Sequence, residues 1–188
     1  MTLSVLDPRT ALLAVDLQKG VAAMPLVHPA AEVAANAGRL AEAFRSAPLP
    51  VVIVRAAGMA PGRTEHSFRR SGDSRPPADA ADLVPEFGSH TQDHTVVKRT
   101  WGSFTATDLD QYLRRQGVTQ VVLTGIATSF AVESTARQAY ELGYNVTLAV
   151  DAMTDFSLEA HTHSLTRVFP ALGETGTTDE IIELLGAQ

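Results

Sequence analysis

The chain has 188 residues, with 15 basic and 21 acidic side chains and a formal net charge of −6 at pH 7. Apolar residues make up 45% and charged residues 19% of it, which excludes a disordered or collagen-like chain. There is no cysteine, so disulfides, thiolate metal sites and a cysteine nucleophile are excluded as well.

The first ten residues lack the basic region and long apolar stretch of a secretory signal, and no apolar run approaches the ~20 residues of a membrane helix. The acidic balance argues against nucleic acid or an anionic membrane as a partner. We therefore expect a cytoplasmic protein that does not engage a membrane. We expect it to fold as a single domain over residues 1–188.

Short apolar runs alternate with amphipathic stretches along the chain. The runs are typical of strands buried on both faces, and in chain order they are residues 11–15, 51–54, 95–97, 121–123 and 146–150. Helical spacing of apolar residues predicts helices over residues 31–46, 107–116, 129–142, 157–168 and 178–185. This alternation indicates βαβ units, and hence a doubly wound, mostly parallel sheet with helices on both faces.

Two stretches interrupt this pattern. Residues 56–94 are too long and too rich in glycine and proline for a simple connection, so they are interpreted as an insertion that forms a lid or binding loop. Residues 173–176 (GETG) predict a turn into the last helix rather than a phosphate cradle.

Charged residues directly follow four of the predicted strands, and they are Asp16, Arg55, Lys98 and Asp151. Asp151 is interpreted as a cap of the next turn. Ligands of an open α/β sheet bind beyond the carboxyl ends of its strands. Asp16 and Lys98 follow the first and third apolar runs. A carboxylate and an ammonium at such positions can share one site and move a proton. A structural ion pair at the sheet edge is the alternative interpretation.

The stretch after the fourth run is a strand-to-helix turn. Thr128 or Ser129 can cap the following helix, and the free N–H groups of its first turn can hold a developing oxyanion. An ordinary β–α loop is the alternative. Ala131 occupies that first turn, where a cysteine would have a lowered pKa. Trp101 and Phe104 can form the wall of a pocket for a flat or apolar substrate, or can simply pack in the core.

The six histidines show no spacing typical of a metal site, and no glycine-rich nucleotide-binding motif occurs. We therefore expect neither a metal nor a cofactor.

Three stretches resemble the isochorismatase-like hydrolases, also called the cysteine hydrolase family. They are ALLAVDLQKG, VVKRTWGSF and VVLTGIATSFAVESTARQAYELGYNVTLAVDAMTD. The resemblance spans most of the chain. It implies a Rossmann-like, three-layer α/β fold with a parallel sheet of about six strands. It also implies a homo-oligomer, either a dimer or a tetramer.

Amidohydrolase members of this family use an aspartate, a lysine and a cysteine. The resemblance assigns the first two roles to Asp16 and Lys98 and puts the cysteine at position 131, where this chain has Ala131. It also implies a cis peptide bond between Ile126 and Ala127. The N–H groups of Ala127 and Ala131 would then form an oxyanion hole.

A methyl side chain cannot attack a carbonyl, so Ala131 closes the covalent amidase route. The resemblance leaves an acid-assisted route open, like that of the true isochorismatases, which cleave a vinyl ether. Our first hypothesis is a hydrolase of a small molecule in which Asp16 is the general acid/base and Lys98 holds charge beside it. The residues predicted to contact the substrate are Gln18, Trp101, Phe104, Thr128, Ser129 and Phe130.

Two alternatives stay open. One is an amidohydrolase scaffold whose cysteine has been replaced by Ala131, either naturally or by engineering. The other is a non-catalytic protein that binds a small molecule in the same pocket.

Overall fold

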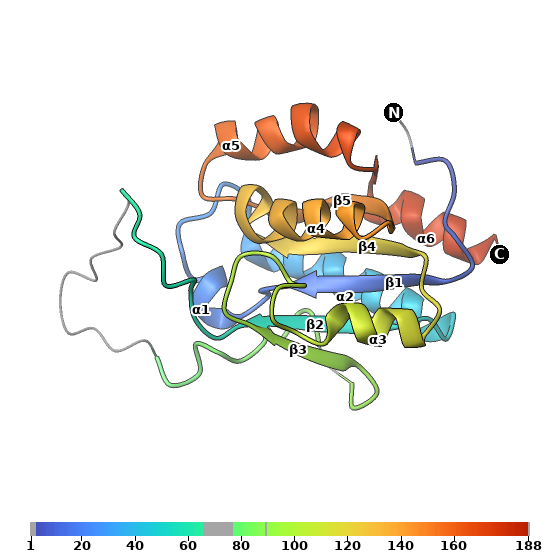
Figure 1. The fold of residues 1–188 in the computed structure, drawn as a ribbon, viewed down its shortest axis with the longest axis horizontal. Helices are drawn as coiled ribbons and strands as arrows, with labels where there is room; N and C mark the ends of the chain where they lie inside the picture. The colour runs from blue at the N-terminus through green and yellow to red at the C-terminus, as the bar shows by residue number, and fades with distance from the viewer. Residues whose placement is uncertain (1–2, 66–76, 89, 188) are drawn as a thin grey trace.

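The computed structural model describes residues 3–65, 77–88 and 90–187. Within them a six-stranded sheet has the strand order β3-β2-β1-β4-β5-β6, and every neighbouring pair is parallel (Figure 1). The strands are β1 (Thr10–Val15), β2 (Val51–Ala56), β3 (His94–Lys98), β4 (Gln120–Ile126), β5 (Asn145–Thr154) and β6 (Glu174–Gly176).

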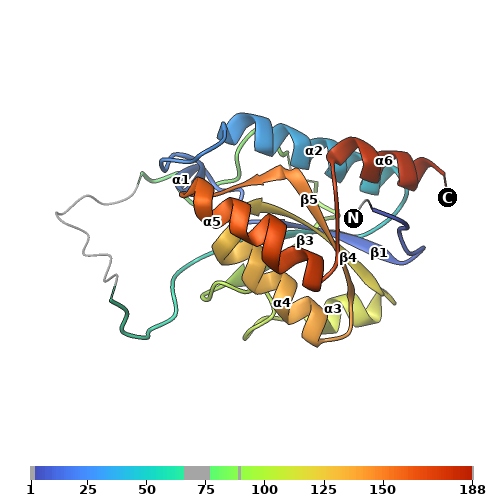
Figure 2. The same cartoon turned by 90° about the horizontal axis from the view of Figure 1, so that it is seen from above.

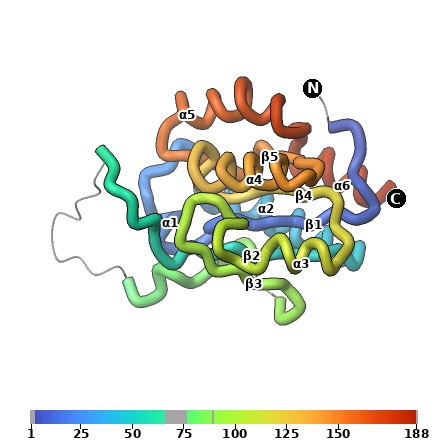
Figure 3. Tube along the Cα trace, viewed as in Figure 1, coloured from blue at the N-terminus to red at the C-terminus, as the bar shows by residue number. Residues whose placement is uncertain are grey.

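Helices cover both faces of this sheet, which makes three layers. Figure 2 shows α2 and α6 on one face and α3, α4 and α5 on the other. Their bounds are α2 (Ala30–Ser46), α3 (Leu109–Arg115), α4 (Glu133–Glu141), α5 (Leu158–His163) and α6 (Thr178–Gly186). The predicted fold class is therefore confirmed. The chain trace in Figure 3 carries both termini to the end of the molecule opposite the carboxyl ends of the strands.

The alternation of side chains along the strands builds one apolar layer on each face of the sheet. Leu12 of β1 packs in a cluster with Phe44 of α2. The next residue, Leu13, packs in the opposite cluster with Leu113 of α3 and Ala136 of α4. Every residue of β1 and β4 is buried, as expected for the central strands of a sheet covered on both faces.

Two predictions are wrong on the β5–β6 side of the sheet. The strand predicted to end at residue 150 continues to Thr154, because its pairing with β4 shifts register between Leu123 and Gly125 and then resumes. The stretch predicted as a turn at residues 173–176 contains β6, which pairs with β5.

The helix predictions differ from the structure mainly at their ends. The predicted helix over residues 129–142 begins as a π-helical turn, η1 (Thr128–Val132), and continues as α4. The helix predicted over 107–116 starts at Leu109. The last part of the helix predicted over 157–168 is a second π turn, η2 (Ser164–Val168), followed by the 3₁₀ turn η3 (Phe169–Ala171). One short helix, α1 (Lys19–Ala22), was not predicted.

The predicted insertion over residues 56–94 lies partly outside the described residues, since 66–76 and 89 are not described. Residues 77–88 pack against the chain that follows β1. The backbone N–H of Val84 donates to the Leu17 carbonyl (3.0 Å), and Phe87 is buried in the core. A lid function for the insertion stays a prediction. No helix in the described parts of the chain combines the length and the apolar character needed to cross a bilayer.

Candidate active site

Asp16 and Lys98 meet at the carboxyl edge of the sheet. Asp16 directly follows β1, and its φ of 55° lies in the left-handed region. Lys98 is the last residue of β3, and its side chain crosses β2, the strand between them, to reach Asp16. Lys98 Nζ lies 2.7 Å from Asp16 Oδ2, and the two side chains are only 2% and 9% exposed. The ion pair is therefore almost completely removed from solvent.

The second carboxylate oxygen of Asp16 is unusual. Oδ1 is buried and has no hydrogen-bond partner among the described residues. Burial raises the pKa of the Asp16 carboxyl above its ordinary value, even though the Lys98 ammonium acts to lower it. A carboxyl group with a raised pKa, and with one oxygen that no described residue binds, is suited to exchanging a proton with a ligand.

The turn after β4 lies next to Asp16. Val15 pairs with Gly125, whose φ is 129°, and a Cβ on that glycine would overlap the Val15 carbonyl oxygen. Glycine therefore allows the ends of β1 and β4 to approach closely. The peptide bond that follows, Ile126–Ala127, is cis. Ala131 then lies in the π turn η1 and is 4% exposed. Single π turns are frequent at functional sites.

The loop that follows Lys98 packs against this turn. The Trp101 ring meets the Phe130 ring edge to face, with centroids 5.0 Å apart. Ser103 Oγ lies 2.8 Å from the hydroxyl of Thr135, which donates to the Ala131 carbonyl (2.7 Å). The ends of β1 and β3 and the turn after β4 therefore meet at one edge of the sheet.

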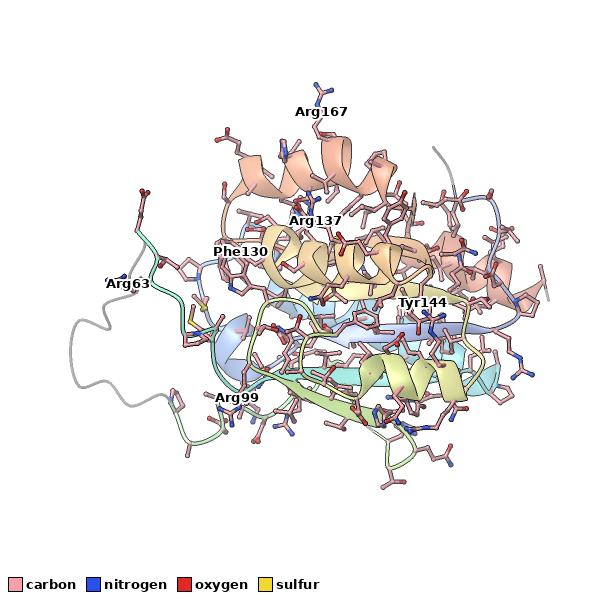
Figure 4. The ribbon with its side chains drawn as sticks, viewed as in Figure 1. Arg63, Arg99, Phe130, Arg137, Tyr144 and Arg167 are labelled. Atoms are coloured by element: carbon pink, nitrogen blue, oxygen red, sulfur yellow. The ribbon has the colours of Figure 1, made fainter. Side chains whose placement is uncertain are left out.

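Two residues predicted to contact the substrate have other partners. The Gln18 side-chain amide accepts from the Ala56 N–H (2.8 Å) and donates to the Ala81 carbonyl (3.2 Å), so it connects β2 to the segment 77–88. The Phe104 ring lies 5.9 Å from the Tyr144 ring. Figure 4 shows Tyr144 at the opposite end of α4 from Phe130. Substrate contact by Phe104 stays a prediction.

Thr128 and Ser129 are not the helix caps that the sequence predicted. The N-cap residue of η1 is Ala127, whose side chain forms no capping hydrogen bond. Instead, the Thr128 hydroxyl donates to the Thr154 carbonyl (3.1 Å) and lies 2.8 Å from His161 Nδ1. The Ser129 N–H donates to a carboxylate oxygen of Asp155 (2.6 Å).

Sequence reasoning missed three residues that adjoin the turn. Asp155 is completely buried. The Phe156 ring lies 6.1 Å from the Phe130 ring and is 39% exposed, so it extends the aromatic pair outward. His161 is buried, and burial together with the neighbouring His28 lowers its pKa.

Asp155 could have been found by examining the residue after each strand, because it directly follows β5. The predicted strand ended too early, and that criterion selected Asp151 instead. Asp151 lies inside β5 and accepts from the Thr178 N–H (2.8 Å) at the start of α6.

In the described residues, no three or more His, Cys, Asp or Glu side chains are grouped so that they could hold a metal ion.

Comparison with known proteins identifies the family of this site. Residues 10–180 match the family model of the isochorismatase domain. The chain belongs to the isochorismatase family. The uncharacterized isochorismatase family protein YwoC of Bacillus subtilis (strain 168) is 42% identical over 188 residues, which cover 97% of each chain. Family membership supports a hydrolase that acts on a small molecule.

Solved structures of this family share the fold. An isochorismatase family protein from Burkholderia thailandensis is 40% identical, with a TM-score of 0.88 over 97% of this chain and 98% of that one. N-carbamoylsarcosine amidase from Thermoplasma acidophilum is 26% identical, with a TM-score of 0.75 over 91% of this chain and 97% of that one. The resemblance predicted from the sequence is therefore confirmed at the level of family and fold.

Proposed function

We propose that this protein hydrolyses a small molecule by acid–base catalysis, with Asp16 as the group that transfers the proton. The observation that carries the proposal is the buried Oδ1 of Asp16, which has no hydrogen-bond partner in the described part of the chain and lies beside the Lys98 ammonium. Burial favours the protonated carboxyl, which is the form that a general acid needs.

In the proposed reaction, Asp16 gives its proton to the leaving atom of the substrate as the bond to that atom breaks. Water adds its oxygen to the other fragment and releases a proton, which restores Asp16. Lys98 keeps a positive charge 2.7 Å from Asp16 Oδ2 and stabilises the carboxylate that forms in between. This sequence of steps needs no covalent intermediate, in agreement with the methyl side chain of Ala131.

The turn after β4 would bind the polar part of the substrate. We assign the N–H groups of Ala127 and Ala131 to a substrate oxygen that gains negative charge. Support for this role comes from the turn's position next to Asp16 and from its π geometry. Trp101 and Phe130, whose rings meet edge to face, would offer an apolar wall beside the turn.

The experiment is a hydrolysis screen over small vinyl ethers, amides and ureido compounds, followed by kinetics on whichever compound is turned over. Asp16→Asn should lower kcat by about 100-fold or more, the typical contribution of a general acid or base. Asp82→Asn is the matched control, because its side chain is 61% exposed. An Asp16→Asn variant that is folded and fully active would remove Asp16 from the mechanism. Tight binding without turnover would favour a binding protein.

A second candidate is an amidohydrolase scaffold that lacks its nucleophile. Similarity to N-carbamoylsarcosine amidase and the burial of Ala131 in the turn favour it. Ala131→Cys should then create amide hydrolysis or rapid labelling by thiol reagents. Ser129→Cys, two residues away, is the control and should show neither. No gain of either property in Ala131→Cys across the amides of the panel would reject this candidate.

A further inference from the structure

We propose that Asp155 is a positioning residue of this site, whose carboxylate holds the turn that carries Ala131. The inference rests on the proposed function only in treating that turn as part of the active site. Its evidence is a separate set of contacts at the end of β5.

The Asp155 carboxylate is completely buried and is satisfied by backbone groups. Oδ2 accepts from the Ser129 N–H (2.6 Å), and Oδ1 accepts from the N–H groups of Phe156 (2.7 Å) and Ser157 (3.3 Å). The two shortest contacts have the length of charge-assisted hydrogen bonds. Burying a carboxylate costs free energy unless hydrogen-bond donors surround it. The carboxylate of Asp155 therefore constrains the position of the backbone N–H groups that donate to it.

The carboxylate replaces a cap that the turn does not have. The first N–H groups of a helix have no partner within it, and η1 receives no side-chain cap from its own N-cap residue. Asp155, the residue directly after β5, supplies the missing acceptor from 26 residues further along the chain. A negative charge at this end of η1 and α4 also interacts favourably with their aligned peptide dipoles.

Two consecutive residues of the turn are joined to two consecutive residues at the end of β5. The Thr128 hydroxyl donates to the Thr154 carbonyl (3.1 Å), and the Ser129 N–H donates to Asp155 (2.6 Å). The Asp155 carbonyl also accepts from the Val27 N–H (2.9 Å), which attaches the segment before α2. The turn is therefore fixed against β5 from its first residues, and the backbone at position 131 follows two residues later.

A thiol introduced at position 131 tests this role without a known substrate. In Ala131→Cys, the Lys98 ammonium and the N–H groups of the turn should lower the thiol pKa below the ordinary value of about 8.5. Adding Asp155→Asn should raise that pKa by about one unit. Alkylation by iodoacetamide at pH 7 should then slow several-fold, because less thiolate is present. Absorbance at 240 nm gives the titration curve.

The sign of this shift separates positioning from simple electrostatics. Loss of a neighbouring negative charge alone would lower the thiol pKa, so a lower or unchanged pKa in the double variant overturns the inference. Asp151→Asn in the Ala131→Cys background is the matched control. Asp151 lies inside β5, and its carboxylate binds the start of α6. The same Asp→Asn change at this position should therefore leave the thiol pKa unchanged.

Amide hydrogen exchange provides a second readout that does not need the thiol, and its first half uses the unmodified protein alone. In the unmodified protein the Ser129 amide should be strongly protected, and in Asp155→Asn its exchange should accelerate at least tenfold while core amides of β1 stay protected. A Ser129 amide that exchanges rapidly in the unmodified protein overturns the inference. An ordinary thiol pKa in the single variant Ala131→Cys would count against the assignment of the turn as a site that stabilises negative charge, and it leaves the proton transfer by Asp16 to its own test. In that case the exchange data alone decide the role of Asp155.

Discussion

Removing Lys98 alone should destabilise the protein strongly, whereas removing both partners of the ion pair should not. Lys98→Met replaces the ammonium with an apolar side chain of similar volume and leaves the Asp16 carboxylate buried without a partner. At the observed separation of 2.7 Å, the attraction between the two charges is about 6 kcal/mol at an effective dielectric constant of about 20. Desolvation of both groups offsets part of this, so losing one partner should cost about 3–5 kcal/mol.

The double variant Asp16→Asn/Lys98→Met should recover most of that loss. Two neutral side chains have no charge to desolvate, and replacing a whole buried ion pair is often neutral or even stabilising. A large loss of unfolding free energy in each single variant, together with a small loss in the double variant, would identify the interaction as electrostatic. Such non-additivity is the expected result for residues in direct contact.

The loss should also depend on pH. Without the ammonium that lowers it, the pKa of Asp16 should rise further above the value in the unfolded chain. The native state then binds more protons than the unfolded state, so stability falls as pH rises from about 4 through the native pKa. Lys98→Met should therefore be closest to the unmodified protein at low pH and furthest from it at neutral pH.

Urea denaturation at pH 5 and pH 7.5, with unchanged m-values, measures these differences. Lys19→Met is the control, because Lys19 forms an ion pair with Asp79 whose side chains are 40% and 55% exposed. Exposed pairs contribute little, so this variant should be nearly as stable as the unmodified protein. A loss below about 1 kcal/mol in Lys98→Met, or a loss that does not change with pH, would refute the reasoning.

Three further predictions follow from the same edge of the sheet. Gly125→Ala should destabilise the protein by clearly more than about 1 kcal/mol in thermal or urea unfolding. The control Gly117→Ala should lower the free energy of unfolding by only about 1 kcal/mol, because the φ of Gly117 is also positive but its Cβ would enter open space. Equal losses in the two variants would contradict the overlap at Gly125. Gln18→Ala should accelerate amide exchange of the segment 77–88 and cost about 1–3 kcal/mol, because buried partners lose their hydrogen bonds. Unchanged exchange there would show that the bridge is unimportant. If Asp16 acts as a general acid, kcat/KM should fall as pH rises above its raised pKa, and a rate independent of pH from about 4 to 9 would exclude that role.

The positions of Asp16 and Lys98 could be predicted because they depend on strand ends alone. Each follows a short apolar run whose limits are clear in the sequence, and the carboxyl ends of parallel strands lie at one edge of a sheet. The end of β5 could not be predicted in the same way. Its pairing shifts register beside Gly125, and a shift of that kind has no signal in the sequence of β5 itself.

The directions of individual side chains near the site were also beyond the sequence. Gln18 lies only two residues from Asp16, yet its amide is bound by the Ala56 and Ala81 backbone, which comes from distant segments. Phe104 follows Trp101 closely, but it packs toward Tyr144 while Trp101 packs on Phe130. Tertiary contacts decide both outcomes, and local spacing does not contain them.

A direct titration of the Asp16 carboxyl tests the proposed chemistry most closely. Carbon-13 NMR of the side-chain carboxyl, assigned with Asp16→Asn, follows its protonation from pH 2 to pH 9 in the unmodified protein. We predict a pKa clearly above the ordinary aspartate value of about 3.9, moving higher still in Lys98→Met. A pKa at or below the ordinary value would mean that Asp16 is a permanently charged half of a structural ion pair, and would contradict its role as the proton donor.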